Sequence, residues 1–323
     1  MTELTRRDAR ARLAVPTVAM LPKIADSLSF LYLDIVRVVQ DDTGVCAQIE
    51  TRRGTETVYI PTAALSCVLL GPGTSVTSRA MATFARHGTT VVFVGAGVVR
   101  TYSGVQPSSL TTTWLEHQVR AWANEDSRLD VARRMYHKRF DDDLPEDITL
   151  AQLRGLEGHR MKAVYRLHAE RQRIGRFKRN YDPERWHDQD PVNVALSAAN
   201  VCLYGVAHAA VLAMGCSPAL GFVHTGTQHS FLFDIADLYK AELTIPLAFA
   251  SHDSPDPEQA VRRHLREGMR LFRFMPRIVT DIQNLLAPES NTPLSRQPES
   301  DLVYLWDPQH GALASGINYA EGD

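Results

Sequence analysis

The chain has 323 residues, of which 44% are hydrophobic and 22% are charged. This composition is typical of a globular protein and excludes a disordered, collagen-like or fibrous chain, and at about 150 residues per domain the length predicts roughly two domains. The formal net charge of −2 gives no sign of a nucleic-acid partner, although an average can hide patches of opposite sign.

Residues 1–104 predict an N-terminal β domain. Short apolar runs alternate with Gly, Pro and Asp turns, a pattern that favours strands. A helix is expected over 78–87, where Gly88 ends it. The expected strands are 28–39, 45–51, 56–60, 66–70, 90–94 and 98–102.

Residues 105–287 predict a larger, all-helical catalytic domain, so the expected fold class is α+β. After a linker at 106–109, the apolar residues recur with helical spacing. From 288 to 323, Pro, Ser, Asn and Gln dominate, and we expect a flexible acidic tail. The expected helices are 111–124, 127–140, 150–174, 192–214, 230–250 and 257–286.

One stretch, 191–233, holds no Asp, Glu, Lys or Arg. Its first part, 194–216, is long enough to cross a bilayer, which takes about 20 residues. It carries Ser197, Asn200 and His208, however, and lacks a flanking belt of Lys or aromatic residues. We therefore expect a buried helix of a soluble domain and no membrane contact.

The cysteines and the N-terminus indicate a cytoplasmic protein. The four cysteines are scattered without a Cys-x-x-Cys pair, which excludes a disulfide scaffold or a zinc ribbon. The arginine-rich N-terminus lacks the apolar stretch of a secretory signal. Reduced thiols in the cytoplasm are the expectation.

Residues 151–180 carry nine basic side chains and two acidic ones, a net charge of +7. Like charges at helical spacing repel one another, so an anionic partner such as a phosphate backbone would explain the segment. Phe177, Tyr181 and Trp186 follow, and aromatic rings beside guanidinium groups suit stacking on unpaired bases. The alternatives are a solvated basic face and aromatic side chains that only pack a loop.

A histidine and three carboxylates form the candidate site. Glu157 lies in the basic segment between Gly155 and Gly158, which we expect to clear space around it. Asp234 and Asp237 share one face of an apolar helix that follows the loop of His224. Buried carboxylates need a partner, and oxygen ligands with one imidazole suit Mg²⁺ or Mn²⁺. The alternative is that these residues only cap, pair and hold the fold.

Four ordered motifs resemble the signature blocks of the CRISPR-associated integrase family (the Cas-one protein), most closely its type I-E branch. They are QLRGLEG at 152–158, CLYG at 202–205, GFVHTG at 221–226 and FDIAD at 233–237. LGPGT at 70–74 and GVVRTY at 97–102 also fit, and the likeness spans roughly 18–286.

The resemblance implies a homodimer, two of which flank a Cas-two dimer to give four integrase and two Cas-two subunits. It implies capture of a short duplex with splayed ends, whose 3′-hydroxyls attack the CRISPR repeat DNA by transesterification. In the family pattern the metal ligands are Glu157, His224 and Asp237, and Asp234 has a supporting catalytic role.

The resemblance also implies a DNA-binding set. Arg100, Arg154 and Arg179 match phosphate-contacting arginines, Tyr181 matches a residue that stacks where the duplex forks, and Tyr204 positions DNA. Trp186 joins this set as a neighbouring aromatic residue. Two positions depart from the pattern: Thr227 replaces a frequent lysine, and Ser75 stands where an arginine is expected.

Two rival functions remain open at this point. A metal-dependent nuclease that acts on branched DNA in repair would use the same residues with water as the nucleophile. A DNA-binding scaffold without catalysis would use the carboxylates only to hold the fold together.

Overall fold

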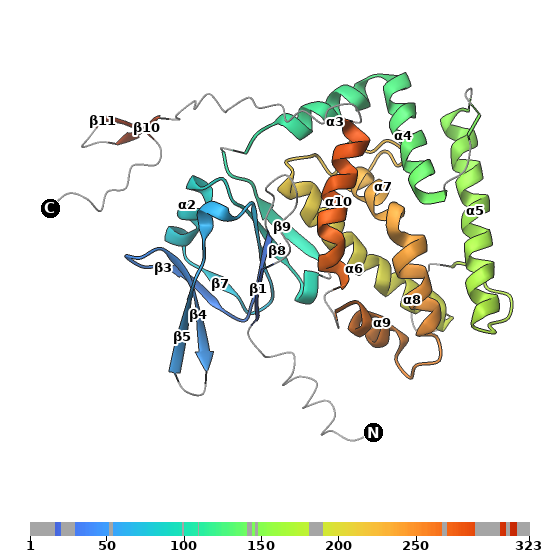
Figure 1. Cartoon of the computed structure of the whole chain (residues 1–323), viewed down its shortest axis with the longest axis horizontal. Helices are drawn as coiled ribbons and strands as arrows, with labels where there is room; N and C mark the ends of the chain where they lie inside the picture. The colour runs from blue at the N-terminus through green and yellow to red at the C-terminus, as the bar shows by residue number, and fades with distance from the viewer. Residues whose placement is uncertain are drawn as a thin grey trace.

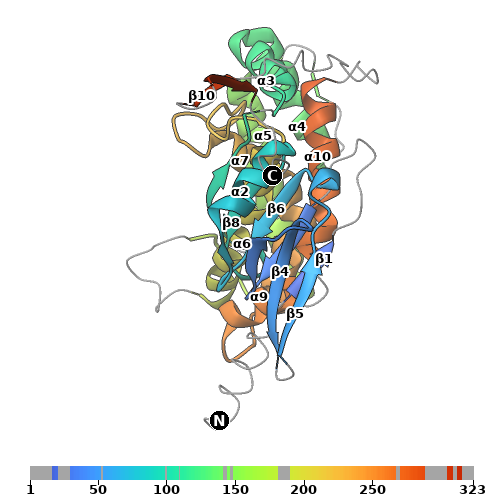
Figure 2. The same cartoon turned by 90° about the vertical axis from the view of Figure 1, so that its left-hand side faces the viewer.

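The computed structural model describes residues 17–20, 30–51, 54–98, 100–108, 110–140, 144–145, 148–180, 190–266, 270–287, 304–307 and 311–314. Within these ranges an N-terminal part built on β-sheets is followed by a larger helical part, so the expected α+β class is confirmed (Figure 1). Figure 2 looks onto the β part and shows the strands in front, with the helices behind them.

A five-stranded mixed sheet forms the centre of the β part. The β2–β6 and β6–β8 pairs are parallel, whereas the two outer pairs are antiparallel. Its strands, in spatial order, are β1 (Thr17–Met20), β2 (Phe30–Asp34), β6 (Cys67–Leu70), β8 (Thr90–Val94) and β9 (Thr101–Val105).

A second, four-stranded sheet packs beside it. Here the expected single strand over 28–39 is wrong, because Ile35 adopts a φ of 56° and turns the chain from β2 into a different sheet. The short helix α2 (Ser78–Arg86) and two 3₁₀ turns, η1 (Thr62–Ala64) and η2 (Ala96–Val98), complete this part. The strands are, in order, β5 (Gly54–Tyr59), β4 (Val45–Thr51), β3 (Arg37–Gln40) and β7 (Ser75–Val76).

The five-stranded sheet is buried on both faces. Side chains alternate across a strand, so Leu31 and Leu33 join the core of the β part while Phe30 and Tyr32 join the core of the helical part. Burial on both faces explains why these strands read as continuous apolar runs rather than as alternating patterns. The sheet therefore belongs to both parts of the molecule.

The helical part begins at Thr113, and one of its expected helices is interrupted. The expected helix over 230–250 contains a π-helical turn, and the described residues of the expected helix over 257–286 form α9 and α10. The elements are α3 (Thr113–Ala123), α4 (Glu125–Phe140), α5 (Leu150–Arg171), α6 (Pro191–Ala213), α7 (Ser230–Tyr239), the π-turn η4 (Lys240–Thr244), α8 (Ile245–Ala250), α9 (Pro257–Arg266) and α10 (Arg270–Leu286).

Helix α6 is the central helix of the helical part. It packs against α7, α8, α9, α10 and the edge strand β9. Among the described residues it is the one helix long and apolar enough to cross a membrane, but 78% of its most apolar window is buried inside the protein. The charge-free stretch thus forms a core helix, as the sequence predicts.

The expected tail contains a short hairpin among its described residues. Two short strands, β10 (Tyr304–Asp307) and β11 (Gly311–Ala314), pair as an antiparallel hairpin. The rest of 288–323 lies outside the described residues. All four cysteines are buried free thiols.

Candidate metal centre and DNA-binding face

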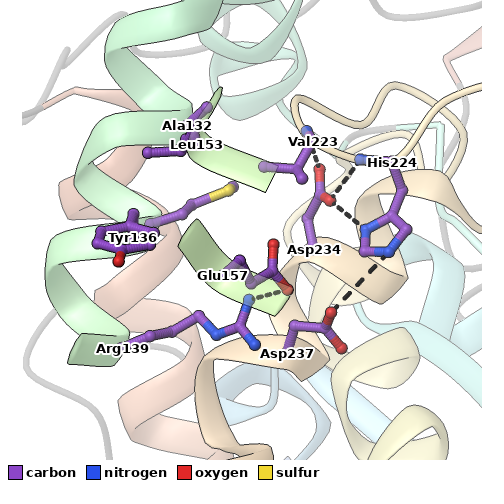
Figure 3. Close-up of a pocket in the computed structure, with 10 residues that line it drawn as sticks. Ala132, Tyr136, Arg139, Leu153, Glu157, Val223, His224, Asp234 and Asp237 are labelled. Atoms are coloured by element: carbon purple, nitrogen blue, oxygen red, sulfur yellow. Dashed lines mark hydrogen bonds and ion pairs between the residues drawn. The ribbon is translucent and has the colours of Figure 1, made fainter. Parts of the chain in front are cut away.

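The four candidate catalytic residues line one small pocket, although they come from different parts of the chain (Figure 3). Helix α5 supplies Glu157, the loop before α7 supplies His224, and α7 supplies both aspartates. The cavity has a volume of about 10 Å³, which is room for a single ion or water molecule. The capping box of Thr149 and Gln152 begins α5 two turns before Glu157 and so fixes the start of that helix.

Asp234 holds the histidine loop by its backbone. Its carboxylate has no exposed surface and accepts the amides of Phe222 (2.5 Å), Val223 (3.1 Å) and His224 (2.9 Å). The same carboxylate lies 2.7 Å from Nδ1 of His224. Both oxygens are therefore engaged, and Asp234 orients His224 from the wall of the pocket.

The contact with Asp234 also decides the chemistry of the imidazole. That hydrogen bond raises the pKa of His224, against the opposing effect of burial. When Nδ1 carries the proton, the neutral ring has a free lone pair on Nε2. Nε2 lies 3.9 Å from Oδ2 of Asp237. A carboxylate behind the far nitrogen is the usual support of a metal-binding histidine.

Side chains from α3, α4 and α5 hold the same loop by its carbonyl groups. Gln118 is fully buried and also accepts the amide of Ser217 at 2.8 Å, so it contacts the loop three times. Almost every polar backbone group before His224 thus has a fixed partner. Gln118 donates to the carbonyls of Ser217 (2.8 Å) and Leu220 (3.2 Å). The other side-chain donors and their carbonyl acceptors are Trp122 to Gly221 (3.1 Å), Arg128 to Phe222 (3.2 Å) and Arg154 to Val223.

Each of the other two carboxylates is paired with a partly buried cation. Glu157 accepts a 2.5 Å bond from Arg139, and Lys240 forms an ion pair with Oδ1 of Asp237. Burial alone would raise the pKa of Asp237, but Lys240 and then Arg139 outweigh it and lower that pKa. Asp237 is therefore a carboxylate at neutral pH.

Lys240 and Arg139 were not among the residues singled out in the sequence. The Lys240 ammonium lies 5.1 Å from the ring centre of Tyr204, and Asp237 and Tyr204 outweigh burial to raise its pKa. A signal for Lys240 exists, because Asp234, Asp237 and Lys240 follow the charge-free run at intervals of three. Arg139 gives no such signal, since its partner Glu157 is 18 residues away on another helix.

The donor set fits a hard divalent cation. Two carboxylates and one imidazole that converge on an ion-sized cavity are the ligands that Mg²⁺ and Mn²⁺ accept in proteins. Within the described ranges, however, no three His, Cys, Asp or Glu side chains already stand at metal-ligand spacing. Asp237 and Glu157 face their cations instead.

The basic segment covers the outer side of the molecule. Helix α5 lies at the edge farthest from the sheets, and only Leu153 and Ala169 along it are buried (Figure 1). Of the nine basic side chains in 151–180, all but Arg179 are exposed. The +7 charge therefore faces solvent beside the pocket that holds Glu157.

The candidate DNA-binding residues have different surroundings. Arg100 is exposed, whereas Arg154 reaches the carbonyl of Val223 and so touches the histidine loop. Tyr204 stacks edge-on against Phe233, with ring centres 5.2 Å apart. Tyr181 and Trp186 lie outside the described residues.

Arg179 is the one candidate arginine with an internal set of partners. It donates to Oδ1 of Asn193 at 3.0 Å and to Oγ of Ser197 at 3.1 Å, at the start of α6. It thereby ties the end of the basic segment to the central helix.

The glycines that flank Glu157 do not serve a close approach within the protein. A Cβ added at Gly155 or at Gly158 would meet nothing within 4 Å, so the expectation that they clear space inside the site is wrong. Gly221 is different, because a Cβ there would collide with the carbonyl of His224 and lie 2.7 Å from the carbonyl carbon of Ser230. That glycine lets the histidine loop close onto α7.

The two departures from the family pattern lie on the surface. Thr227 is exposed, and its amide bonds Oγ of Ser230 at 3.1 Å, so it helps to start α7. Ser75 is an exposed residue of β7, the edge strand beside β3. Neither residue lines the pocket.

Comparison with known proteins agrees with this architecture. The sequence profile described as CRISPR associated protein Cas1 matches residues 136–252. A CRISPR-associated endonuclease Cas1 from Thermus thermophilus is 39% identical over 309 residues, which are 94% of this chain and 93% of that protein. The Cas1 endonuclease of Escherichia coli is 39% identical over 231 residues, 71% of this chain and 76% of that one.

Solved structures extend the likeness to three dimensions. The TtCas1–DNA complex superposes with a TM-score of 0.74 at 39% identity, over 83% of this chain and 99% of the other. A casposase bound to its integration product shares the fold with a TM-score of 0.58 at 11% identity, over 80% and 96% of the two chains. These matches place the chain in the class of CRISPR-associated endonucleases. The chain belongs to the Cas1 family of CRISPR-associated endonucleases.

Proposed function

We propose that this chain is the integrase of CRISPR adaptation, which joins the 3′-hydroxyl ends of captured foreign DNA to the CRISPR repeat. The observation that carries the proposal is the convergence of Glu157, His224 and Asp237 on one ion-sized pocket beside a basic helix. Family membership and a related Cas1 solved with DNA support DNA as the substrate.

Glu157, His224 and Asp237 would hold Mg²⁺ or Mn²⁺, through carboxylate oxygens and Nε2. The bound cation would polarise the phosphoryl oxygen under attack and stabilise the charge that develops on it. Asp234 keeps the proton on Nδ1 of His224, so that Nε2 stays available as a ligand.

The reaction is a transesterification that leaves the number of phosphodiester bonds unchanged. The 3′-oxygen of the captured DNA bonds to phosphorus, the bond from that phosphorus to the 3′-oxygen of the repeat strand breaks, and the proton of the attacking hydroxyl ends on the departing one. The DNA supplies the nucleophile, so no serine or cysteine nucleophile is required. Positioning and electrostatics therefore supply most of the catalysis.

The basic face would hold the captured duplex through its phosphates. Arg154 links this face to the site, because the same side chain bonds the loop of His224. Arg100, Tyr204, Tyr181 and Trp186 complete the proposed DNA path, and Arg179 would act through the end of the basic segment. Affinity for DNA should fall steeply with added salt, as expected where phosphates are neutralised.

The proposed assembly is a homodimer, two of which bind a Cas-two dimer in the cytoplasm. Exposed apolar side chains on the β part support a protein interface there, since edge strands are natural sites of association. These side chains are Val58, Tyr59, Tyr102 and Val105. Sedimentation of the purified chain alone, and with its Cas-two partner, would measure the stoichiometry.

A strand-transfer assay tests the function. The protein, its Cas-two partner and Mg²⁺ or Mn²⁺ are mixed with a short splayed duplex and a plasmid that carries the repeat. We expect joined DNA from the wild type and from Glu170→Ala, an exposed acid on the same helix, and none from Glu157→Ala or His224→Ala. Full joining by Glu157→Ala would refute the site assignment.

The repair-nuclease alternative predicts a different product from the same assay. Cleaved but unjoined DNA from the wild type would favour hydrolysis with water as the nucleophile. A protein that binds DNA, binds no divalent metal and leaves the DNA intact would favour the scaffold.

A further inference from the structure

Both proposed metal-binding carboxylates have one oxygen engaged by a cation of the protein itself. Oε1 of Glu157 bonds Nη1 of Arg139 at 2.5 Å, and Oδ1 of Asp237 pairs with Nζ of Lys240. The second oxygen of Asp237 faces Nε2 of His224 at 3.9 Å. In Figure 3, Arg139 reaches Glu157 from one side of the pocket and His224 faces Asp237 from the other.

The two cations are partly buried, so their charges are only weakly screened. The side chains of Arg139 and Lys240 are only 8% and 17% exposed, so water screens them poorly. Nε of Arg139 is buried without a hydrogen-bond partner among the described residues, and its guanidinium lies 4.9 Å from the ring centre of Phe140. Removing such a charge from water costs free energy of folding, which points to a functional reason for the pairing.

Two separate elements deliver the two cations. Arg139 is the next-to-last residue of α4, and Lys240 is the first residue of the π-turn that interrupts the expected long helix. π-turns within helices are frequent at functional sites. Here the turn begins three residues after Asp237, and its first residue forms an ion pair with that carboxylate.

The charge balance of the pocket depends on these residues. Glu157, Asp234 and Asp237 bring three carboxylates to the lining of one small cavity. Without compensation, such a pocket would be costly to fold and would bind divalent cations tightly. Arg139 and Lys240 each pair with one of these carboxylates and offset its charge.

We propose that Arg139 and Lys240 are built-in counter-ions, which hold one oxygen of each ligand carboxylate and keep the affinity of the site for a divalent cation low. They are positioning residues, not catalytic ones. The inference rests on the metal centre of the proposed function. A weakly binding site remains folded without metal and responds to the metal concentration or to the arrival of phosphate ligands.

The test measures Mn²⁺ affinity of the full chain without DNA, by electron paramagnetic resonance and calorimetry. Lys240→Gln and Arg139→Gln each remove one counter-ion and should bind Mn²⁺ about tenfold more tightly than the wild type. Arg120→Gln removes the same charge from an exposed Arg–Glu pair, 68% and 48% exposed, and should leave the affinity unchanged. Lys240→Arg keeps the charge and should restore wild-type affinity.

Stability gives a second readout. Without metal the two Gln variants should melt at lower temperature, because a carboxylate loses its partner, and saturating Mn²⁺ should raise their melting temperature more than that of the wild type. If Lys240→Gln fails to fold, Arg139→Gln carries the test, since its partner Glu157 is 20% exposed.

The outcomes separate this inference from the proposed function. Unchanged or weaker Mn²⁺ binding by both Gln variants, with normal binding by the wild type, would overturn the counter-ion role and leave the metal centre intact. No Mn²⁺ binding by the wild type would overturn the metal centre itself. Tighter binding by Arg120→Gln as well would show a general charge effect and also overturn the inference.

Discussion

Oδ1 of Asp234 accepts two hydrogen bonds from the same residue, one from the backbone amide of His224 at 2.9 Å and one from its ring Nδ1 at 2.7 Å. A single oxygen therefore fixes both where the histidine backbone lies and which ring nitrogen carries the proton. The position and the protonation of His224 are coupled through one side chain.

Asp234→Asn should separate these two roles. An amide offers one acceptor oxygen, so either the loop amides or Nδ1 must face an NH₂ group. We expect a loss of about 2 kcal/mol in the free energy of unfolding and a 10- to 100-fold loss of Mn²⁺ affinity. Urea denaturation and calorimetry measure the two effects, and wild-type values for both would contradict the coupling.

Gln118 should support the same loop from the opposite side. Gln118→Ala leaves the amide and carbonyl of Ser217 and the carbonyl of Leu220 without their partner. Because these groups are partly buried, we expect a loss of about 1–2 kcal/mol in the free energy of unfolding. Gln172→Ala, at an exposed position, is the control. An equal loss of stability in both variants would contradict a specific role of Gln118 in supporting the loop.

The glycines beside Glu157 give a test of where DNA approaches. Gly155→Ala and Gly158→Ala have room in the protein, so each should stabilise α5 by about 1 kcal/mol. If DNA lies against this backbone, the same variants should bind DNA more weakly at matched salt. Thermal melting and a fluorescence-anisotropy titration are the measurements. Stabilisation with unchanged DNA affinity would place the DNA elsewhere on α5.

Acid should destabilise the protein partly through His208. Burial, with a smaller effect of His229, lowers the pKa of His208 from 6.5 to about 4. Between those values the unfolded chain binds more protons, so stability falls as the pH drops from 6.5 towards 4. Between pH 7 and pH 5, the free energy of unfolding of His208→Asn should fall by about 1 kcal/mol less than that of the wild type. This figure allows for the partial exposure of the His208 side chain. The midpoints of urea denaturation at both pH values measure this difference. The same change in midpoint for the wild type and for His208→Asn would show that His208 does not contribute to the acid sensitivity.

The order of elements could be predicted from the sequence, but not where the chain changes sheets. The strand over 45–51 and the strand over 90–94 match β4 and β8 residue for residue. The run over 28–39 hides its break because the strand is buried on both faces, and nothing in its composition marks Ile35 as the turning point. A left-handed backbone at a β-branched residue is imposed by tertiary packing, not by local preference.

The candidate site, too, could be predicted only in part, because some of its contacts depend on the tertiary fold. The residue pattern points to Asp234 and Asp237 and, less sharply, to Glu157 and His224. Resemblance to a family assigns different roles to the two aspartates. The division of labour between the two aspartates depends on which one meets the loop amides, and that depends on the fold. Pairs that cross between helices, such as Arg139 with Glu157, leave no regular spacing in the sequence.

The sheet that serves both cores makes the two parts of the molecule one cooperative unit. Side chains of β2, β6 and β8 share a single apolar cluster with α6 and α7, and Thr101 of β9 bonds the carbonyl of Gly205 at 2.8 Å. The change of pattern near residue 104 therefore marks no boundary in the core. Neither part can melt without exposing the apolar face of the other, so a ligand that stabilises the helical pocket also protects the distant sheet against unfolding.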